Sequence, residues 1–374
     1  MNKKEKQLTF LDLFSGIGGF RIGLERAGFK SIGYCDNDKY ANKLYKAYFN
    51  TEKELFFDDI RKINTEYLPD FDILCAGFPC QSFSIAGKRR GFEDTRGTMF
   101  FEVARILSDK RPRYFILENV KGLLSHEKGK TFQTILKILS DLGYSIQWQL
   151  LNSKFFNVPQ NRERVYIVGY YGKECIGKIF PLTGCGSENI SPLNKSPLSF
   201  GVSQGGRIYT PNGISPCLTA NGGGLGANTG LYFVSRIKYD KYKPSNILPC
   251  LLVCGDTPLI RVKNGTKSGF DIAEAGDGIN LACPNSKTRR GRVGKQCSQT
   301  LDTHCNMGTI DNYRIRRLTP LECFRLQGFP DDMVETAKKI NISDSQLYKM
   351  AGNAVTVNVV EAVAQKIMDL ELWT

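Results

Sequence analysis

The sequence predicts an α/β fold in which helices cover both faces of a mostly parallel sheet, with a smaller loop-rich domain beside it. Two patterns alternate through the first 170 of the 374 residues: short apolar, β-branched runs and segments with helical periodicity. The alternation stops near residue 171, and residues 171–314 are rich in Gly, Pro, Ser and Asn. Strand–helix–strand repeats favour a parallel sheet, and the change in composition indicates a second domain.

The apolar runs are expected to form buried strands of one sheet. They are LTFLDLF (8–14), SIGYC (31–35), FDILCAGF (71–78), RYFILENV (113–120) and RVYIVGY (164–170). A further short strand is expected to end at FFDDI (56–60).

Helical segments lie between several of these runs and return at the end of the chain. They are FRIGLERAGF (20–29), DKYANKLYKAYF (38–49), GTMFFEVARILSDK (97–110), TFQTILKILSDLG (131–143), LTPLECFRLQGF (318–329) and AVTVNVVEAVAQKIMDLEL (354–372). The last segment is amphipathic and has no partner nearby in sequence. We therefore expect it to pack back on the first domain.

The net charge is strongly basic and unevenly distributed. Lys and Arg number 51 against 37 Asp and Glu, a formal net charge of +14. Residues 171–314 hold 17 Lys and Arg and 9 Asp and Glu, a net +8 and more than half of the excess. Such an excess favours a polyanionic partner, nucleic acid first, although a solvated basic surface without a partner would look the same.

Cysteine usage and hydropathy exclude several classes of protein. The 12 cysteines form no C-x-x-C pair and the chain has only His126 and His304, so we expect no metal site. The N-terminus lacks the apolar core of a signal peptide, and no run approaches the roughly 18 apolar residues of a membrane span. We expect a cytoplasmic protein with reduced thiols and no membrane contact.

DLFSGIGGF (12–20) places a glycine-rich turn between a strand end and a helix start. Glycines let backbone N–H groups approach a ligand, and a helix N-terminus favours negative charge. Asp36 follows the second strand, 20 residues after Gly16, where an acid can bind ribose hydroxyls in nucleotide-binding α/β folds. Asp59 follows the expected third strand. Together they indicate an adenosine-containing cofactor; the alternatives are surface turn acids, with Asp38 as a helix cap.

GFPCQSFS (77–84) places Cys80 directly after a proline, at the edge of the sheet where α/β folds bind ligands. An isolated cysteine is most often a small buried hydrophobe. However, Glu118 of ENV ends the next strand, and QNRER (160–164) adds Arg162 and Arg164. A thiol beside guanidinium groups suggests covalent catalysis, because nearby cations favour the nucleophilic thiolate.

With these motifs in place, the chain resembles a bacterial DNA (cytosine-5-)-methyltransferase. The matching blocks occur in family order: DLFSGIGGF, YCDNDKYA, DDI, GFPCQSFS, RGTMFFEVARIL, LENVKGLL, FNVPQNRERVYIVG, RRLTPLECFRLQGFPDD and QLYKMAGNAVTVNVV. The combination of Pro-Cys-Gln, Glu-Asn-Val and Gln-x-Arg-x-Arg is highly specific.

The resemblance implies a Rossmann-like S-adenosylmethionine-dependent methyltransferase domain and a smaller, loop-rich target-recognition domain. The catalytic domain would comprise residues 1–171 plus 346–374. Residues 172–345 would form the target-recognition domain, with a variable part at about 172–314 and a family block at 316–332.

The resemblance also implies a covalent mechanism on a flipped-out cytosine of duplex DNA. The Cys80 thiolate would add to C6, so that C5 can attack the methyl group of S-adenosylmethionine. Glu118 would hold N3 and the exocyclic amine, while Arg162 and Arg164 would help to place the base. Loss of the C5 proton and of Cys80 would then release 5-methylcytosine.

Cofactor and DNA contacts follow from the same blocks. The cofactor residues would be Phe14, Gly16 and Gly18 on the methionine side, Asp36 on the ribose, Asp59 and Ile60 on the adenine, and Asn353 and Val355 from the C-terminal block. The residues expected to contact DNA are Gln81, Ser84, Lys88, Arg89 and Arg90 in the loop after Cys80, and Gln204, Arg207 and Thr300 in the recognition domain.

Two departures from the family pattern leave points open. Asn37 stands where an aromatic or aliphatic residue often packs on adenine. Cys217 stands where a Thr often precedes Leu, so either residues 217–219 or the later Thr300-Leu301 would contact DNA.

Competing interpretations are an RNA cytosine-5 methyltransferase of the tRNA-modifying branch, a catalytically inactive DNA-binding module and a dinucleotide-dependent oxidoreductase. The long basic domain argues against the first, the intact Cys80 and Glu118 against the second, and the absence of G-x-G-x-x-G against the third. We expect a monomer at the bacterial nucleoid. The family is often paired with a restriction endonuclease that acts on the same site. The target sequence does not follow from the residues.

Overall fold

The computed structural model describes residues 7–79, 99–172, 179–182, 208–209, 231–232, 252–254, 257–283, 288–311 and 314–372. They belong to two units, one of Met1–Leu182 with Pro249–Thr374 and one of Thr183–Leu248. The described part of the second unit is a parallel pair, β9 (Ile208–Tyr209) and β10 (Leu231–Tyr232). All other elements belong to the first unit.

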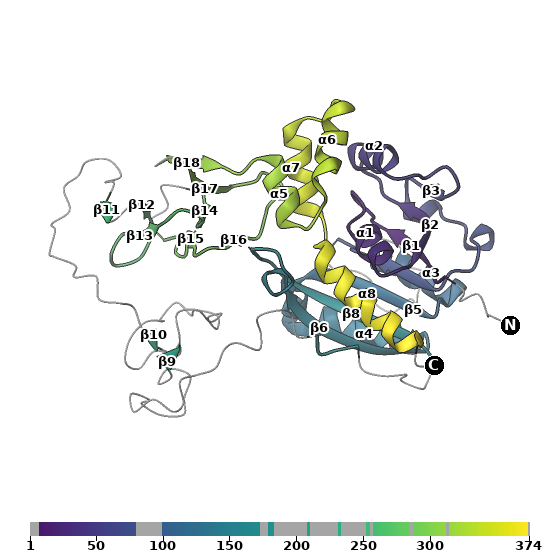
Figure 1. The fold of residues 1–374 in the computed structure, drawn as a ribbon. Helices are drawn as coiled ribbons and strands as arrows, with labels where there is room; N and C mark the ends of the chain where they lie inside the picture. The colour runs from purple at the N-terminus through teal and green to yellow at the C-terminus, as the bar shows by residue number, and fades with distance from the viewer. Residues whose placement is uncertain are drawn as a thin grey trace. The chain divides into compact units, whose positions relative to one another are not determined.

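A seven-stranded sheet forms the centre of the first unit, in the order β3-β2-β1-β4-β5-β8-β6 (Figure 1). Its strands are β1 (Thr9–Leu13), β2 (Lys30–Cys35), β3 (Leu55–Phe57), β4 (Ile73–Ala76), β5 (Tyr114–Val120), β6 (Tyr144–Asn152) and β8 (Glu163–Tyr171). The five strands from β3 to β5 are parallel, whereas β8 is antiparallel to both β5 and β6. The prediction of a mostly parallel sheet is confirmed, but β6 was not predicted.

Side chains alternate between two hydrophobic cores, one on each face of the sheet. In β1, Phe10 enters one core while Leu11 and Leu13 enter the other, as the two-residue period of a strand requires. Helices α1 (Gly19–Arg26) and α8 (Val357–Leu372) pack on the Phe10 side. Helices α3 (Met99–Lys110) and α4 (Lys130–Asp141) pack on the opposite side. The predicted two-sided covering of the sheet is therefore confirmed.

Helix α8 returns the end of the chain to the N-terminal helix, and Figure 1 shows it lying across the sheet. The approach to α1 is so close that a β-carbon on Gly23 would lie 2.7 Å from Cβ of Val360. At its other end, Glu371 accepts a 2.6 Å hydrogen bond from the hydroxyl of Tyr114 and pairs with Arg113. The expectation that the last helix packs on the first domain is confirmed.

Four helices share a third hydrophobic core: α2 (Lys39–Tyr48), α5 (Pro320–Leu326), α6 (Asp331–Lys339) and α7 (Asp344–Asn353). Asp38 caps α2 by accepting hydrogen bonds from the backbone of Tyr40 and Ala41, which confirms the capping alternative for this residue. The same carboxylate forms a 2.7 Å ion pair with Lys349 of α7.

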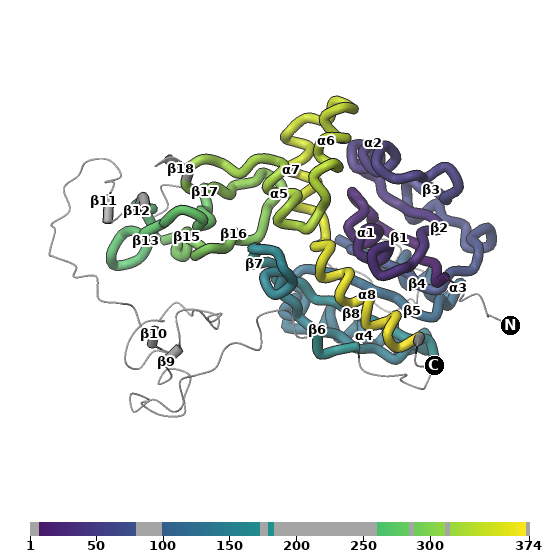
Figure 2. The backbone as a smooth tube through the Cα atoms, viewed as in Figure 1, coloured from purple at the N-terminus to yellow at the C-terminus, as the bar shows by residue number. Residues whose placement is uncertain are grey.

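The remaining strands are short and lie between residues 160 and 317. Two antiparallel groups are β11 (Leu252–Cys254), β12 (Thr257–Lys263) and β13 (Phe270–Ala273), and β15 (Val293–Gly294), β14 (Gly278–Asn280), β17 (Met307–Asp311) and β18 (Arg314–Arg317). Figure 2 shows β7 (Gln160–Asn161) beside β16 (Ser298–Gln299), with which it pairs in parallel. This pairing joins the predicted recognition region to the first two residues of QNRER.

Candidate active site

The glycine-rich turn lies between β1 and α1, as the sequence predicts. Phe14 and Gly16 have positive φ values of 57° and 53°, and Gly18 has a φ of 85°. The turn is closed by a 2.8 Å hydrogen bond from the Gly18 N–H to the Ser15 carbonyl. A β-carbon on Gly16 would have no neighbouring atom within 4 Å, so the backbone there borders open space that a ligand could fill.

Asp36 follows the end of β2 and lies against this turn. One carboxylate oxygen accepts a 2.7 Å hydrogen bond from the Gly16 N–H, and the other accepts one of 2.7 Å from the Asp38 N–H. Burial raises the pKa of Asp36, against the lowering effect of these two donors. Each carboxylate oxygen keeps a second lone pair for ribose hydroxyls. The structure thus brings two predicted cofactor residues into direct contact.

Asp59 and Ile60 lie after β3 but face different surroundings. Ile60 is 3% exposed and belongs to the core, whereas Asp59 holds Arg61 in a 2.6 Å ion pair. The hydrogen bond from Arg61 lowers the pKa of Asp59 to about 2. The Asp59 carboxylate is therefore ionised and already engaged with a neighbouring guanidinium.

Asn353 ends α7, and Val355 lies in the short link to α8; together they are called the C-terminal link. Asn353 is exposed, while Val355 is buried against the edge of the sheet. A β-carbon on Gly77, directly after β4, would lie 3.6 Å from Cγ1 of Val355 and 3.7 Å from Oε2 of Glu118. The C-terminal block, the predicted catalytic carboxyl of Glu118 and the strand leading to Cys80 therefore meet at one point.

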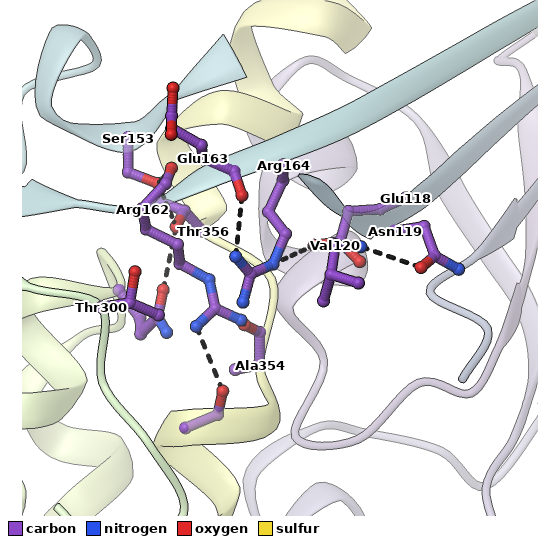
Figure 3. A network of polar contacts seen from close by, with 12 residues as sticks. Glu118, Asn119, Val120, Ser153, Arg162, Glu163, Arg164, Thr300, Ala354 and Thr356 are labelled. Atoms are coloured by element: carbon purple, nitrogen blue, oxygen red, sulfur yellow. Dashed lines mark hydrogen bonds and ion pairs between the residues drawn. The ribbon is translucent and has the colours of Figure 1, made fainter. Parts of the chain in front are cut away.

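Glu118 lies near the end of β5, with 8% of its surface exposed. Its Oε1 is 3.1 Å from Nε of Arg164, and Figure 3 shows the Arg164 side chain reaching toward it. Burial raises the pKa of Glu118, while Arg164 and, less strongly, Arg162 lower it. The net direction is upward, so the carboxyl retains its proton to higher pH than an exposed glutamate would.

Arg162 is directed toward the C-terminal link (Figure 3). Its two terminal nitrogens donate hydrogen bonds of 3.2 Å to the Gly352 carbonyl and 2.8 Å to the Ala354 carbonyl. Burial lowers the pKa of Arg162 to about 10, yet the side chain stays protonated near neutral pH. These two carbonyls flank Asn353. Arg162 therefore connects the predicted cofactor residues to the edge of the sheet that carries Glu118 and Arg164, which we call the predicted catalytic edge.

Asn119 is a residue whose role the sequence analysis did not assign. It is 2% exposed, and its side-chain amide donates a 2.9 Å hydrogen bond to the carbonyl of Phe78. Its position within ENV was the available signal, because an amide beside a catalytic carboxyl can fix a neighbouring backbone. Asn119 thus holds the backbone two residues before Cys80.

Several predicted site residues lie outside the described residues. They are Cys80, Gln81, Ser84, Lys88, Arg89, Arg90, Gln204 and Arg207, together with the segment 217–219. Thr300 is described and exposed, and its hydroxyl donates a 2.9 Å hydrogen bond to the carbonyl of Asn161. Thr300 therefore lies beside QNRER, while the alternative segment 217–219 lies outside the described residues.

No group of three or more His, Cys, Asp or Glu side chains among the described residues could hold a metal ion. No helix in the described ranges is both long and apolar enough to cross a membrane.

Comparisons of the chain with a family model and with known relatives agree on one family. The chain matches the family described as C-5 cytosine-specific DNA methylase over residues 8–194 and 259–369. It is 34% identical to the orphan methyltransferase M.Rho11sI of Bacillus phage rho11s, covering 97% of this chain and 98% of the relative. It is 37% identical to the type II methyltransferase M.HpaII of Haemophilus parainfluenzae, covering 98% and 91%.

A solved structure supports the fold. The crystal structure of a Spodoptera frugiperda DNMT2 mutant matches with a TM-score of 0.52 at 16% identity, covering 98% of this chain and all of that one. At this identity the likeness concerns the fold alone. It agrees with a Rossmann-like methyltransferase domain.

Proposed function

We propose a mechanism that proceeds from one premise: the chain belongs to the family of C-5 cytosine-specific DNA methylases and is a DNA (cytosine-5-)-methyltransferase. The proposal is that it methylates C5 of a flipped-out cytosine in a specific short sequence of duplex DNA. Cys80 forms a transient covalent bond to C6. The observation that carries the proposal is the meeting of Glu118, Arg164 and Val355 beside the strand that leads to Cys80.

S-adenosylmethionine is the proposed cofactor, and it supplies an electrophilic methyl group when bound. The open backbone at Gly16 and the Asp36 carboxylate suit the methionine and ribose parts of such a molecule. Asn353 and Val355 close the pocket from the C-terminal link. Asp59 serves the adenine amine only if it shares its carboxylate with Arg61.

Glu118 has the properties that activation of cytosine requires. N3 of the ring carries a lone pair, so a partner must donate a proton to it. Because burial raises its pKa, Glu118 keeps that proton to higher pH than an exposed glutamate would. As the Cys80 thiolate adds to C6, the proton moves from Glu118 to N3 and C5 becomes electron-rich. After methylation the C5 proton leaves to a base, Cys80 is eliminated as the thiolate, and N3 returns its proton to Glu118, which restores the aromatic ring.

Arg164 and Arg162 have separate tasks in this proposal. Arg164 contacts Glu118 directly and lies where it can orient the carboxyl and the base. Arg162 acts through the backbone of the C-terminal link. It is therefore a positioning residue for the cofactor pocket, whereas the sequence analysis grouped it with the residues that place the base.

We propose that residues 172–345, which include the basic region, form the domain that recognises the DNA target. Residues 1–171 and 346–374 form the catalytic domain in this proposal. Thr300 of this region donates a hydrogen bond to the carbonyl of Asn161 in QNRER. Exchanging residues 172–314 for the matching segment of a relative is expected to change the methylated sequence. An unchanged target would contradict this division.

The decisive experiment is base-resolution mapping of 5-methylcytosine in duplex DNA treated with purified protein and S-adenosylmethionine. One short methylated motif supports the proposal, and Cys80→Ser is expected to abolish methylation while DNA binding persists. Near-normal turnover by that variant would contradict the covalent mechanism. Methylation of tRNA but not of DNA in a parallel reaction would favour the RNA interpretation instead.

We further propose that the protein acts as a monomer on chromosomal DNA in the cytoplasm. Some relatives are named type II methyltransferases and others orphan methyltransferases. Pairing with a restriction endonuclease is therefore not part of the proposal.

A further inference from the structure

Gln160 is a fully buried amide at the junction of three segments. Its side chain is 0% exposed. Its Oε1 accepts a 3.2 Å hydrogen bond from the N–H of Leu301, and its Nε2 donates one of 2.8 Å to the carbonyl of Leu326 at the end of α5. The amide thus pairs with a backbone N–H of one segment and with a backbone carbonyl of another.

The backbone around Gln160 is tied to the same recognition segment. Ser298 pairs with Gln160 in the β7–β16 ladder, and its N–H donates a 2.7 Å hydrogen bond to the carbonyl of Pro159. The hydroxyl of Thr300 donates a hydrogen bond to the carbonyl of Asn161, two residues further along the chain than Pro159. Residues 298–301 are therefore held in one register against the strand that leads to the catalytic arginines.

This attachment decides which side chain the segment presents. Leu301 is 2% exposed and packs in the core of α5 and α7, while Thr300 beside it is exposed. Gln160 bonds the backbone N–H of Leu301, so it fixes the residue that anchors the segment. A shift of Leu301 would move the exposed Thr300 relative to Glu118 and Arg164.

Every second residue of QNRER bonds to a different part of the site. Gln160 bonds to the recognition segment, Arg162 to the C-terminal link and Arg164 to Glu118. We propose that Gln160 is a positioning residue that sets the Thr300-Leu301 segment in register with the catalytic edge, and so contributes to target discrimination. This inference rests on the proposed function.

The first test is Gln160→Met, which keeps the approximate size of the side chain and removes both hydrogen bonds. Leaving the N–H of Leu301 and the carbonyl of Leu326 unpaired is expected to raise KM for DNA by about tenfold, or roughly 1.4 kcal/mol. The ratio of kcat/KM between the cognate site and a site with one mismatch should fall. The Kd for S-adenosylmethionine and kcat at saturating DNA should change less than about twofold, a split that general destabilisation would not produce.

A second variant, Gln160→Glu, keeps the test informative if the methionine variant does not fold. A protonated glutamic acid has one donor and one acceptor, as glutamine does, whereas the ionised form cannot donate to the carbonyl of Leu326. The ratio of this variant's KM for DNA to the wild-type KM, measured at each pH, should fall toward one as the pH is lowered. A cavity or packing defect would show no such recovery.

Gln149 provides a matched control. Its side chain also accepts a hydrogen bond from a backbone N–H and donates one to a carbonyl, both of Leu182, so its partners lie outside residues 298–301 and α5. Gln149→Met should leave KM for DNA and discrimination unchanged. Wild-type methylation with an unaltered KM and mismatch ratio in Gln160→Met would overturn this inference alone. A wild-type protein that does not methylate DNA would overturn it together with the proposed function.

Discussion

Gly19, the first residue of α1, tests the link between the N-terminal helix and the C-terminal part of the predicted cofactor pocket. A β-carbon at this position would lie 2.6 Å from Cγ2 of Val355 and 3.0 Å from its carbonyl oxygen. The substitution Gly19→Ala therefore directs its strain onto a residue that we assign to the pocket.

The size of the effect follows from these distances. Unstrained carbon atoms lie about 3.5–4.0 Å apart, so the added methyl group and Val355 must separate by roughly 1 Å. Val355 cannot move away freely, because Arg162 holds the preceding carbonyl of Ala354 at 2.8 Å. Overpacking of this kind costs about 1–3 kcal/mol, which is roughly 5- to 150-fold in an equilibrium constant. We expect this cost to divide between the free energy of unfolding and the Kd for S-adenosylmethionine.

Thermal unfolding and calorimetric titration with S-adenosylmethionine measure the two parts. Adding Val355→Ala to Gly19→Ala removes Cγ2 and should restore part of the lost stability, because only the contact with the carbonyl remains. Gly122→Ala is a matched control, since its β-carbon would lie no closer than 3.9 Å to another atom, Cγ2 of Val120. If Gly19→Ala behaves like Gly122→Ala in both measurements, the reasoning is refuted.

Two further predictions concern the catalytic edge. Because burial raises the folded-state pKa of Glu118 above its unfolded value, its contribution to stability is fully present below the unfolded pKa, near 4.3, and is lost as the pH rises through the folded pKa. Glu118→Gln stays neutral, so its Tm relative to wild type should be higher at pH 8 than at pH 4, while methylation is lost; an equal Tm difference at both pH values would contradict a raised pKa. Arg162→Met leaves the carbonyls of Gly352 and Ala354 unpaired and should raise the Kd for S-adenosylmethionine at least tenfold, or about 1.4 kcal/mol, with little change in the Kd for DNA. A larger effect on DNA binding than on cofactor binding would assign Arg162 to the base instead.

The sequence predicts the strands of the sheet wherever both faces are buried. β4 and β5 are continuous apolar runs because helices cover them on both sides. β6 has a different pattern, since Gln147 and Gln149 face the segment Ile179–Leu182 and bond to its backbone. A strand whose polar side chains pair with a distant segment gives no local apolar signal. The antiparallel direction of β8 is likewise absent from hydrophobic periodicity, which is the same for both directions.

In the site, too, the sequence predicts which residue types are present but not which groups they contact. Motifs identify Glu118 and Arg164 as residues at the strand ends. The structure places Oε1 of Glu118 3.1 Å from Nε of Arg164. The partners of Arg162 lie 190 and 192 residues away and are backbone carbonyls, which have no sequence identity to recognise. The sequence does not reveal the roles of Asn119 and Gln160 either, because an amide is recognised as a positioning group only when its hydrogen-bond partners are known.

Helix α8, at the end of the chain, is attached to other elements at both of its ends. At the start of the helix, the N–H of Val357 donates a 2.9 Å hydrogen bond to the carbonyl of Gln327. At its far end, the Glu371 carboxylate holds Tyr114 at the beginning of β5. A helix fixed at both ends cannot slide along the sheet without breaking one attachment. Glu118 lies on the same strand as Tyr114, so β5 and α8 together set the distance between the carboxyl of Glu118 and the link that carries Val355.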